Sequence, residues 1–365
     1  MGKGKTEAVY CNKCILTDGY PGIVFDEHGA CNFCLAHSDR AALGKGPLVK
    51  LVNSLKRGGE YDCVVPISGG KDSVFILRYA VKELGLRAVA VNYNSGMQSD
   101  LAIENMKNAC DILHVPLIFK KADEKLQTRR LEAMLRLSER LGSFVLGCGG
   151  CVPVLQSATI SFANENNIPI VLDGGSSLEH VPSLKDKGQG SIFKAFAERF
   201  KNGMKPLFRY KLYDLDVIKY AYLFRYRKYD KRLKRAMGVF KTARPPLGYV
   251  DPFISGRAAI IRFSNYIMMP EAEMVRIIKQ ELKWKNPEGT DKRFDCLLHC
   301  LFDFDHLSRY GITSNGVVYS NMIRQGLMDR EDALRKETRA KENIFKECGA
   351  LCERLGLREY KMPSL

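Results

Sequence analysis

The sequence predicts an α/β protein built on a Rossmann-like parallel sheet with helices on both faces. Short apolar runs alternate with helix-like segments between residues 46 and 180, and strands that are joined by helices pair in parallel. A glycine-rich segment directly follows the first apolar run. We expect strands over residues 62–67, 87–91, 115–119 and 168–172, and helices over residues 74–84, 101–113 and 154–166.

Local signals set the ends of these elements. Gly85 ends the helix 74–84, because glycine is common just past a helix C-terminus. Asp100 is a plausible cap for the helix 101–113. The run 87–91 is the short apolar segment between the two helices, so it reads as the second strand.

Composition divides the chain into three regions. Residues 1–45 form an expected zinc-ribbon segment, residues 46–180 an expected nucleotide domain, and residues 181–365 a basic and helical region that we expect to bind substrate or partner. The range 185–244 holds 18 Lys and Arg against 5 Asp and Glu, in a chain of net charge +16. Such a block favours an anionic partner such as a nucleotide, a sugar nucleotide or RNA. A solvated surface or a docking face for an acidic subunit are the alternatives.

Neither a membrane span nor a secretory signal is visible in the sequence. No apolar run approaches the ~20 residues that cross a bilayer, and no apolar core follows the basic and polar residues 1–9. We therefore expect a cytoplasmic protein with no membrane insertion. Eight of the twelve cysteines lie in pairs three or four residues apart, which then indicates metal binding or catalysis rather than disulfides.

The hexapeptide Ser68-Gly69-Gly70-Lys71-Asp72-Ser73 has the features of a phosphate site. Its glycines let the backbone approach an anion closely, and the free N–H groups of the following helix point at that anion. Lys71 adds a positive charge, the two serines add hydroxyl donors, and Asp72 is placed to cap the helix or to hold Mg²⁺. The spacing is not that of a Walker A loop.

A second loop is expected beside this one. Asp173 and Gly174 follow the strand 168–172, and ligands of parallel sheets bind beyond the carboxyl ends of the strands. We therefore expect both residues to line the phosphate site.

Four cysteines near the N-terminus have the spacing of a zinc ribbon. Two Cys-x-x-Cys pairs are separated by 16 residues, within the range typical of such sites. Four thiolates satisfy Zn²⁺ and leave no position open, so the site is expected to be structural. The predicted ligands are Cys11, Cys14, Cys31 and Cys34.

The hexapeptide resembles the PP-loop of the ATP pyrophosphatases. The resemblance implies that residues 46–180 form a domain of that superfamily, with a HUP-type sheet. It implies that ATP is cleaved between its α and β phosphates, with Lys71, Asp72 and Ser68 as catalytic residues. Members transfer AMP to an amide or carbonyl oxygen, and a nitrogen or sulfur nucleophile then displaces it.

A third cysteine pair, Cys148 and Cys151, lies where tRNA-thiolating members of this superfamily carry a similar pair. There the pair and a distant third cysteine hold an iron–sulfur cluster or form a redox couple. Cys296 or Cys300 would be the third cysteine here. The alternatives are a zinc half-site or two reduced thiols. Neither known type of glutaminase nucleophile is visible around these cysteines, so ammonia must come from elsewhere.

Further segments resemble the N-acetyl sugar amidotransferases of bacterial surface-polysaccharide (lipopolysaccharide, O-antigen) pathways. The resemblance implies that a nucleotide-linked sugar has its N-acetyl group converted to an acetamidino group. It also implies a separate glutaminase and an ammonia-channel subunit. Beyond the ribbon and the hexapeptide, the matching segments are Pro21-Gly22-Ile23, Phe25-Asp26-Glu27, Trp284-Lys285-x-Pro287, Arg293-Phe294-Asp295, His299 and residues 320–331.

Four residues of the C-terminal region suit an anionic sugar or its nucleotide, namely Arg293, Asp295, His299 and Arg324. The alternative is ordinary pairing on a helix surface, because Asp295 and His299 are four residues apart. Trp284 is the single tryptophan, and we expect it in a core or a domain interface.

The competing hypothesis is a tRNA sulfurtransferase, which would bind RNA. The basic range 185–244, the ribbon, and Cys148 with Cys151 support it. The segment around Arg293 and Arg324 favours the sugar enzyme. A non-enzymatic binding module is disfavoured because the hexapeptide is intact.

Overall fold

The computed structural model describes residues 8–38, 41–121, 152–175, 253–255, 258–287 and 293–354. A six-stranded sheet forms the centre of the α/β part, with the order β3-β2-β1-β4-β6-β5. Every neighbouring pair is parallel except for the edge pair of β5 and β6. The fold class predicted from the sequence is confirmed. The strands are β1 (Cys63–Pro66), β2 (Ala88–Asn94), β3 (Leu117–Lys121), β4 (Ile170–Asp173), β5 (Phe253–Ser255) and β6 (Ala258–Arg262).

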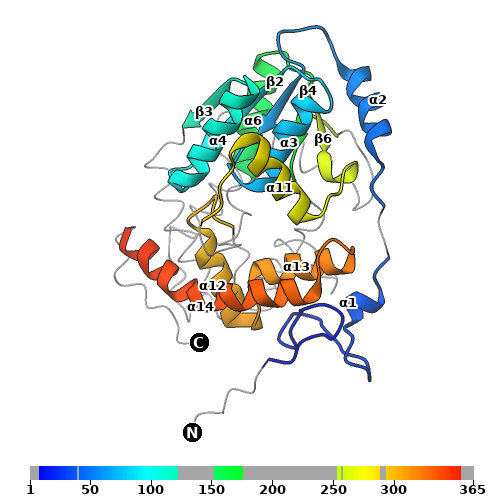
Figure 1. Ribbon diagram of the computed structural model, residues 1–365, viewed down its shortest axis with the longest axis vertical. Coiled ribbons are helices and arrows are strands. Elements are labelled where there is room, and N and C mark those ends of the chain that lie inside the picture. The colour runs from blue at the N-terminus through cyan, green and yellow to red at the C-terminus, as the bar shows by residue number, and fades with distance from the viewer. Residues whose placement is uncertain are drawn as a thin grey trace, which may run out of the picture.

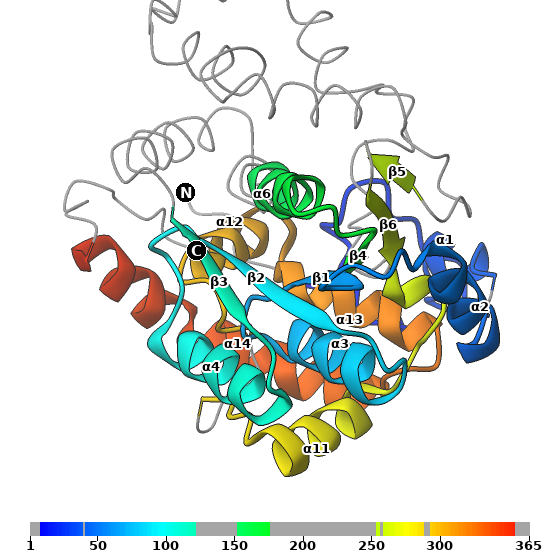
Figure 2. The same ribbon diagram turned by 90° about the horizontal axis from the view of Figure 1, so that it is seen from above.

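Helices cover both faces of this sheet (Figure 2). Alternate residues of β1 point to opposite faces. Val65 therefore packs in the larger core, whereas Val64 packs with the helix on the other side. The helix on that side is α6 (Val152–Glu165). The larger core is covered by α2 (Lys45–Leu55), α3 (Lys71–Lys82), α4 (Asp100–Leu113) and α11 (Glu271–Leu282).

The N-termini of α3 and α4 differ in how they are capped. Gly70 is the N-cap residue of α3 and offers no side chain, so Asp72 lies within the first turn and is not the cap. Ser99 caps α4, and its hydroxyl accepts a hydrogen bond from the N–H of Ala102 at 3.1 Å. The expected cap of α4, Asp100, is instead the first helical residue, where its charge still suits the helix dipole.

The sheet extends beyond residue 180, where we expected the nucleotide domain to end. Strand β6 pairs with β4 from Ile170↔Ala259 to Asp173↔Arg262. Helix α11 then packs against α3. A parallel strand buried between two faces must be apolar on both, and β6 reads Ala-Ala-Ile-Ile-Arg. The α/β part therefore includes the elements from 253 to 282. The basic range 185–244 lies outside the described residues.

The N-terminal cysteine segment and the C-terminal helices pack together below the α/β part (Figure 1). Ile15, Leu16 and Tyr20 share a core with Val317 and Met322. A short segment with few apolar residues thus completes its core with helices from the other end of the chain. The elements involved are α1 (Asn32–Leu35), α12 (His299–Tyr310), α13 (Ser314–Arg324) and α14 (Arg330–Arg354).

Polar contacts strengthen this packing. The guanidinium of Arg330 donates to the carbonyls of Cys14 and Cys11 at 3.0 and 2.9 Å. Lys341 donates to the Tyr10 hydroxyl at 2.6 Å.

Within the described ranges, none of the helices combines the length and apolar character that a membrane crossing requires.

The loop between β1 and α3 is packed from outside by α4 and by residues just after α11. Gly69 has φ of +82°, and a Cβ at this position would lie 2.1 Å from the carbonyl oxygen of Ala102. The indole N–H of Trp284 donates to the Gly69 carbonyl at 3.0 Å. Trp284 is itself buried in the larger core, as its expected core or interface role requires.

We predict that Gly69→Ala destabilises the protein by at least ~2 kcal/mol, because an alanine would meet both a left-handed backbone and the α4 backbone. Gly96→Ala is the matched control. Gly96 has φ of +76° but nothing within 4 Å of an added Cβ, so it should cost only about 1 kcal/mol. Equal losses for the two variants in urea unfolding would contradict the close packing of the loop.

Candidate functional site

The two serines of the hexapeptide brace the loop from inside. The Ser73 hydroxyl donates to the Gly70 carbonyl at 3.0 Å and accepts from the Ser68 N–H at 3.1 Å. The Ser68 hydroxyl accepts from the Gly70 N–H at 3.3 Å. These bonds hold the turn at the N-terminus of α3, where a helix attracts anions.

Lys71 is surrounded by carboxylates. Its Nζ lies 2.8 Å from Asp72 Oδ2 and 3.8 Å from Glu271 Oε2. Burial alone would lower the pKa of Lys71, but the charges of Asp72 and Glu271 outweigh it and raise that pKa. The ammonium is therefore a permanent cation at the loop. Glu271 also contacts Lys336 of α14 at 3.1 Å.

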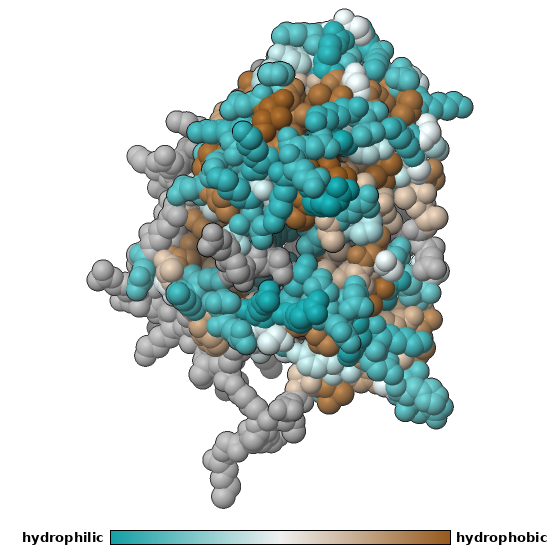
Figure 3. All heavy atoms as spheres, viewed as in Figure 1, coloured by the Kyte–Doolittle hydropathy of each residue, from teal (hydrophilic) through white to brown (hydrophobic). Residues whose placement is uncertain are grey.

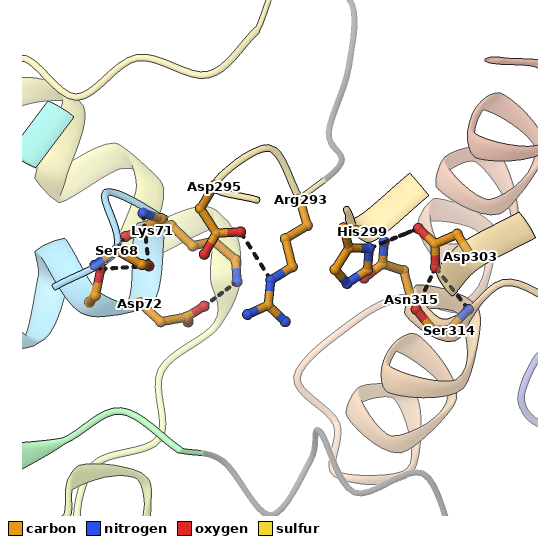
Figure 4. A network of polar contacts seen from close by, with 11 residues as sticks. Ser68, Lys71, Asp72, Arg293, Asp295, His299, Asp303, Ser314 and Asn315 are labelled. Atoms are coloured by element: carbon orange, nitrogen blue, oxygen red, sulfur yellow. Dashed lines mark hydrogen bonds and ion pairs between the residues drawn. The ribbon is translucent and has the colours of Figure 1, made fainter. Parts of the chain in front are cut away.

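Asp295 and Arg293 lie directly at residues 68–73, which we call the phosphate loop (Figure 4). The Asp295 carboxylate lies against the loop backbone, since its Oδ2 would be 3.2 Å from a Cβ on Gly70. Its Oδ1 accepts from Arg293 Nε at 3.1 Å. Burial raises the pKa of Asp295, but the charge of Arg293, together with that of His299 when its ring is protonated, outweighs it and lowers that pKa. The structure thus joins two segments that the sequence analysis singled out separately.

His299 pairs with a residue that the sequence analysis did not name. It is the first residue of α12, and its Nδ1 lies 3.1 Å from Asp303 Oδ2. The alternative of surface pairing between Asp295 and His299 is wrong, because Asp295 precedes the helix and both side chains are buried. The His-x-x-x-Asp spacing was the available signal for this pair.

Helix α13 holds Asp303 in place. Asp303 Oδ1 accepts from the N–H of Ser314 at 3.0 Å and from the Ser314 hydroxyl, and its Oδ2 accepts from Asn315 Nδ2 at 3.2 Å. Burial raises the pKa of Asp303, but His299 and these donors outweigh it and lower that pKa. Asp303 is therefore a carboxylate.

Asp173 is the last residue of β4, and Gly174 follows it beside the helix of the phosphate loop. A Cβ on Gly174 would lie 3.1 Å from Ile76 Cδ1 of α3. Asp173 Oδ2 accepts from the Gly175 N–H at 3.3 Å. Burial raises the pKa of Asp173, and the charge of Arg262 opposes this only in part. Both residues lie at the carboxyl edge of the sheet, as β4 and β1 are parallel neighbours.

Arg324 lies at the N-terminal cysteines. Its Nη1 is 3.4 Å from Cys14 Sγ and 3.8 Å from Cys34 Sγ, and Nη2 bonds to Asn321. The structure therefore places Arg324 against the thiols instead of beside Arg293 and Asp295. Its contacts join residues that are 310 and 290 positions apart, so no local pattern in the sequence indicates them.

The four expected zinc ligands converge. All four sulfurs lie within 4.8 Å of one another, and no other such group of His, Cys, Asp or Glu occurs among the described residues. Cys11 Sγ is 3.9 Å from Cys34 Sγ, and Cys14 Sγ is 3.8 Å from Cys31 Sγ. Four thiolates ~2.3 Å from a central zinc lie about 3.8 Å apart. The geometry therefore fits one tetrahedral ion.

Charge also favours a cation among these thiols. Burial works to raise the pKa of Cys11, but backbone N–H groups of three residues bring it down to about 7. The hydrogen bond with Cys31, together with burial, raises the pKa of Cys14 to about 12. The Cys11 thiolate is thus stabilised mainly by backbone N–H groups, and a bound metal ion would stabilise the thiolate form of the other three cysteines.

The expected second metal site remains a prediction. Cys148 and Cys151 lie outside the described residues. Cys296 packs against the core formed by α12 and α14, and the Cys300 thiol donates to the Leu297 carbonyl at 3.3 Å.

Comparisons with known proteins were made by family, by sequence and by structure. No family model matches the chain. An uncharacterized protein of Methanocaldococcus jannaschii is 34% identical over 73 residues, which are 20% of this chain and 26% of that protein. The tRNA(Ile)-lysidine synthase of Buchnera aphidicola is 34% identical over 82 residues, covering 20% of this chain and 18% of that protein. The chain thus matches about a quarter or less of these relatives' lengths.

Three solved structures are similar at low TM-scores. NMN synthetase from Francisella tularensis has 22% identity and a TM-score of 0.25, over 36% of this chain and 53% of that chain. The U34-tRNA thiolase NcsA from Methanococcus maripaludis, with its [4Fe-4S] cluster, has 15% identity and a TM-score of 0.32, over 89% and 91%. NH3-dependent NAD synthetase from Campylobacter jejuni has 12% identity and a TM-score of 0.28, over 51% and 96%.

We predict that Cys11→Ser or Cys31→Ser lowers both the zinc content and the thermal stability of the protein, because metal binding at a closed four-thiolate site is coupled to folding. Elemental analysis of the purified protein gives the stoichiometry, expected at about one zinc per wild-type chain. Cys110→Ala is the control, since Cys110 is buried in α4 and is not one of the four clustered cysteines, so the zinc content should not change. Wild-type protein that contains no zinc would refute the assignment.

Proposed function

We propose that this chain is an ATP-dependent, AMP-forming amidotransferase that converts the N-acetyl group of a nucleotide-linked sugar into an acetamidino group. The observation that carries the proposal is the close approach of the Asp295 carboxylate to Gly70 in the phosphate loop. The loop is the part that resembles ATP pyrophosphatases, and the segment with Arg293 and Asp295 is part of what resembles the sugar enzymes. Their contact supports one site for ATP and sugar.

The chemistry requires an activated carbonyl. An acetamide is a poor electrophile, and adenylation of its oxygen gives an imidate with AMP as leaving group. Ammonia adds to that carbon and AMP departs. Lys71, the free N–H groups of α3 and Mg²⁺ would neutralise charge on the phosphates, and most of the rate would come from positioning and electrostatics.

The surroundings of the loop suit an anionic substrate. The face in Figure 3 is hollowed between the α/β part and the C-terminal helices, and mainly hydrophilic side chains surround the hollow. Arg293, beside Asp295 at the loop, is partly exposed, with 38% of its side chain accessible. A guanidinium in this position suits the diphosphate of a sugar nucleotide.

The main test is substrate-dependent AMP formation. The protein is incubated with ATP, Mg²⁺, ammonium and a panel of nucleotide-linked N-acetyl sugars, and AMP and the amidine product are measured. AMP formation that needs both a sugar and ammonia supports the proposal. The competing hypothesis is a tRNA sulfurtransferase, and the Buchnera relative is named as an enzyme of tRNA. A tRNA sulfurtransferase would bind tRNA with an affinity that falls steeply with salt. AMP formation dependent on tRNA would overturn the proposal.

We predict that Lys71→Ala lowers AMP formation at least ~100-fold, because the loop loses the cation that faces the phosphates. The fold should persist, since Lys71 lies on the first turn of α3, 30% of its side chain is accessible and its contacts are ion pairs. Lys82→Ala is the control on the same helix, where it removes only a surface pair with Glu281. Turnover of Lys71→Ala at the wild-type rate would remove the phosphate-loop assignment.

We predict that the isolated chain uses ammonia but not glutamine, and that glutamine supports activity only when a separate glutaminase is added. Ammonia has a pKa of roughly 9, so the free base increases between about pH 7 and 9 and activity with ammonium salts should rise with it. A complex fed by a glutaminase through a channel should show a weaker rise. Amidine formed by the purified chain from glutamine alone would show that a glutaminase site is present in it.

A further inference from the structure

The buried pair of His299 and Asp303 has the arrangement of an oriented base. Asp303 accepts from Ser314, from Asn315 and from the imidazole. The carboxylate has only acceptor oxygens, so His299 Nδ1 must carry the hydrogen of their 3.1 Å contact. In the neutral ring, the lone pair then lies on Nε2. Across the described part of the chain, no residue hydrogen bonds to Nε2.

The imidazole of His299 lies across Arg293 from the phosphate loop (Figure 4). Asp295, four residues before His299, lies against Gly70 of the loop, with its Oδ2 3.2 Å from where a Cβ on Gly70 would be. In Figure 4 the imidazole lies between Arg293 and Asp303, and the phosphate loop lies on the far side of Arg293 from the imidazole. The lone pair of Nε2 is thus available on a residue that borders the site, while Nδ1 is fixed to the protein.

We infer that His299 is the base that takes a proton from the nitrogen nucleophile after it adds to the adenylated carbon, and that Asp303 is the positioning residue that fixes the tautomer. This inference rests on the proposed function. Burying a His–Asp pair costs free energy, and an apolar pair would fill a core as well. The location beside the loop gives this pair a chemical use.

The step balances as follows. Adenylation leaves the carbon in a protonated imidate, bonded to the oxygen of AMP. Ammonia donates its electron pair to that carbon, a C–N bond forms, and the C=N π electrons return to the sugar nitrogen. Nε2 accepts one proton from the new ammonium. The nitrogen lone pair then reforms a C=N bond, the C–O bond breaks, and its electrons leave with the AMP oxygen, which gives an amidinium.

Separating the two half-reactions tests the role of His299. Exchange of labelled pyrophosphate into ATP, with the sugar nucleotide and without ammonia, reports adenylation alone. Amidine formation reports both steps. For His299→Gln and Asp303→Asn we expect exchange within about threefold of wild type and amidine formation reduced ~100-fold or more, the usual worth of a general base. In Asp303→Asn the amide can donate to Nδ1, which moves the ring hydrogen to Nε2.

Asp305→Asn is the matched control, because it lies on the same helix, α12, makes the same carboxylate-to-amide change and weakens the ion pair with Arg309 instead of the pair with His299. It should leave both half-reactions unchanged. Circular dichroism reports the fold of every variant. Because a buried substitution at Asp303 can unfold the protein, His299→Ala supplies a second measurement, in which added imidazole should restore at least a tenth of the wild-type amidine rate.

Each outcome decides a different claim. Loss confined to the ammonia step, with rescue by imidazole, supports the inference. Amidine formation by His299→Gln at the wild-type rate overturns it, as does an equal loss of both half-reactions in folded His299→Ala without rescue, which is the result of a purely structural role. If the wild-type chain shows no pyrophosphate exchange that depends on an N-acetyl sugar, the proposed function fails and the inference fails with it.

Discussion

The hydrogen bonds to the carbonyl of Gly69 tie the phosphate loop to distant parts of the chain. Trp284 donates to this oxygen at 3.0 Å, and Asn105, which also bridges to the backbone of Lys285, approaches it at 3.5 Å. A left-handed glycine is needed at this position because α4 lies against its α-carbon. The loop is therefore shaped by what surrounds it, and the segment after Trp284 is brought close to it. This constraint puts Asp295 at the N-terminus of α3.

Helix α13 connects the thiol cluster with the residues beside the loop. Its first turn supplies Ser314 and Asn315 to Asp303, and its last turn supplies Arg324 to two of the cysteine sulfurs. The ribbon and α13 also share one apolar core. A four-thiolate metal centre carries net negative charge, which a guanidinium in contact with the sulfurs offsets. Loss of the metal would thus loosen the helix whose other end orients His299.

Local sequence patterns predicted the parts of the fold that local chemistry determines. The run before Ser68, the glycines and the following helix are contiguous, and the four cysteines of the ribbon follow a spacing that one ion dictates. Contacts such as that of Trp284 with Gly69 join residues 215 positions apart and leave no periodic signal. The partner of His299 was within reach of the sequence through its i,i+4 spacing. That this pair would be buried, and held by α13, depended on packing that no short motif encodes.

The charges around the loop show what binding of a triphosphate must change. Lys71 forms ion pairs with Asp72 and Glu271. Glu271 also pairs with Lys336, and Asp295 pairs with Arg293. The cations are therefore balanced by carboxylates before any ligand enters. A polyphosphate adds negative charge among three carboxylates, and at short range like charges repel by several kcal/mol at an effective dielectric constant of about 20. The carboxylates must turn away or share a divalent cation with the phosphates, and this is the physical reason to expect Mg²⁺ with the nucleotide. Of the three carboxylates, Asp72 is the most exposed, at 50% of its side chain, so it is the one that can turn at least cost.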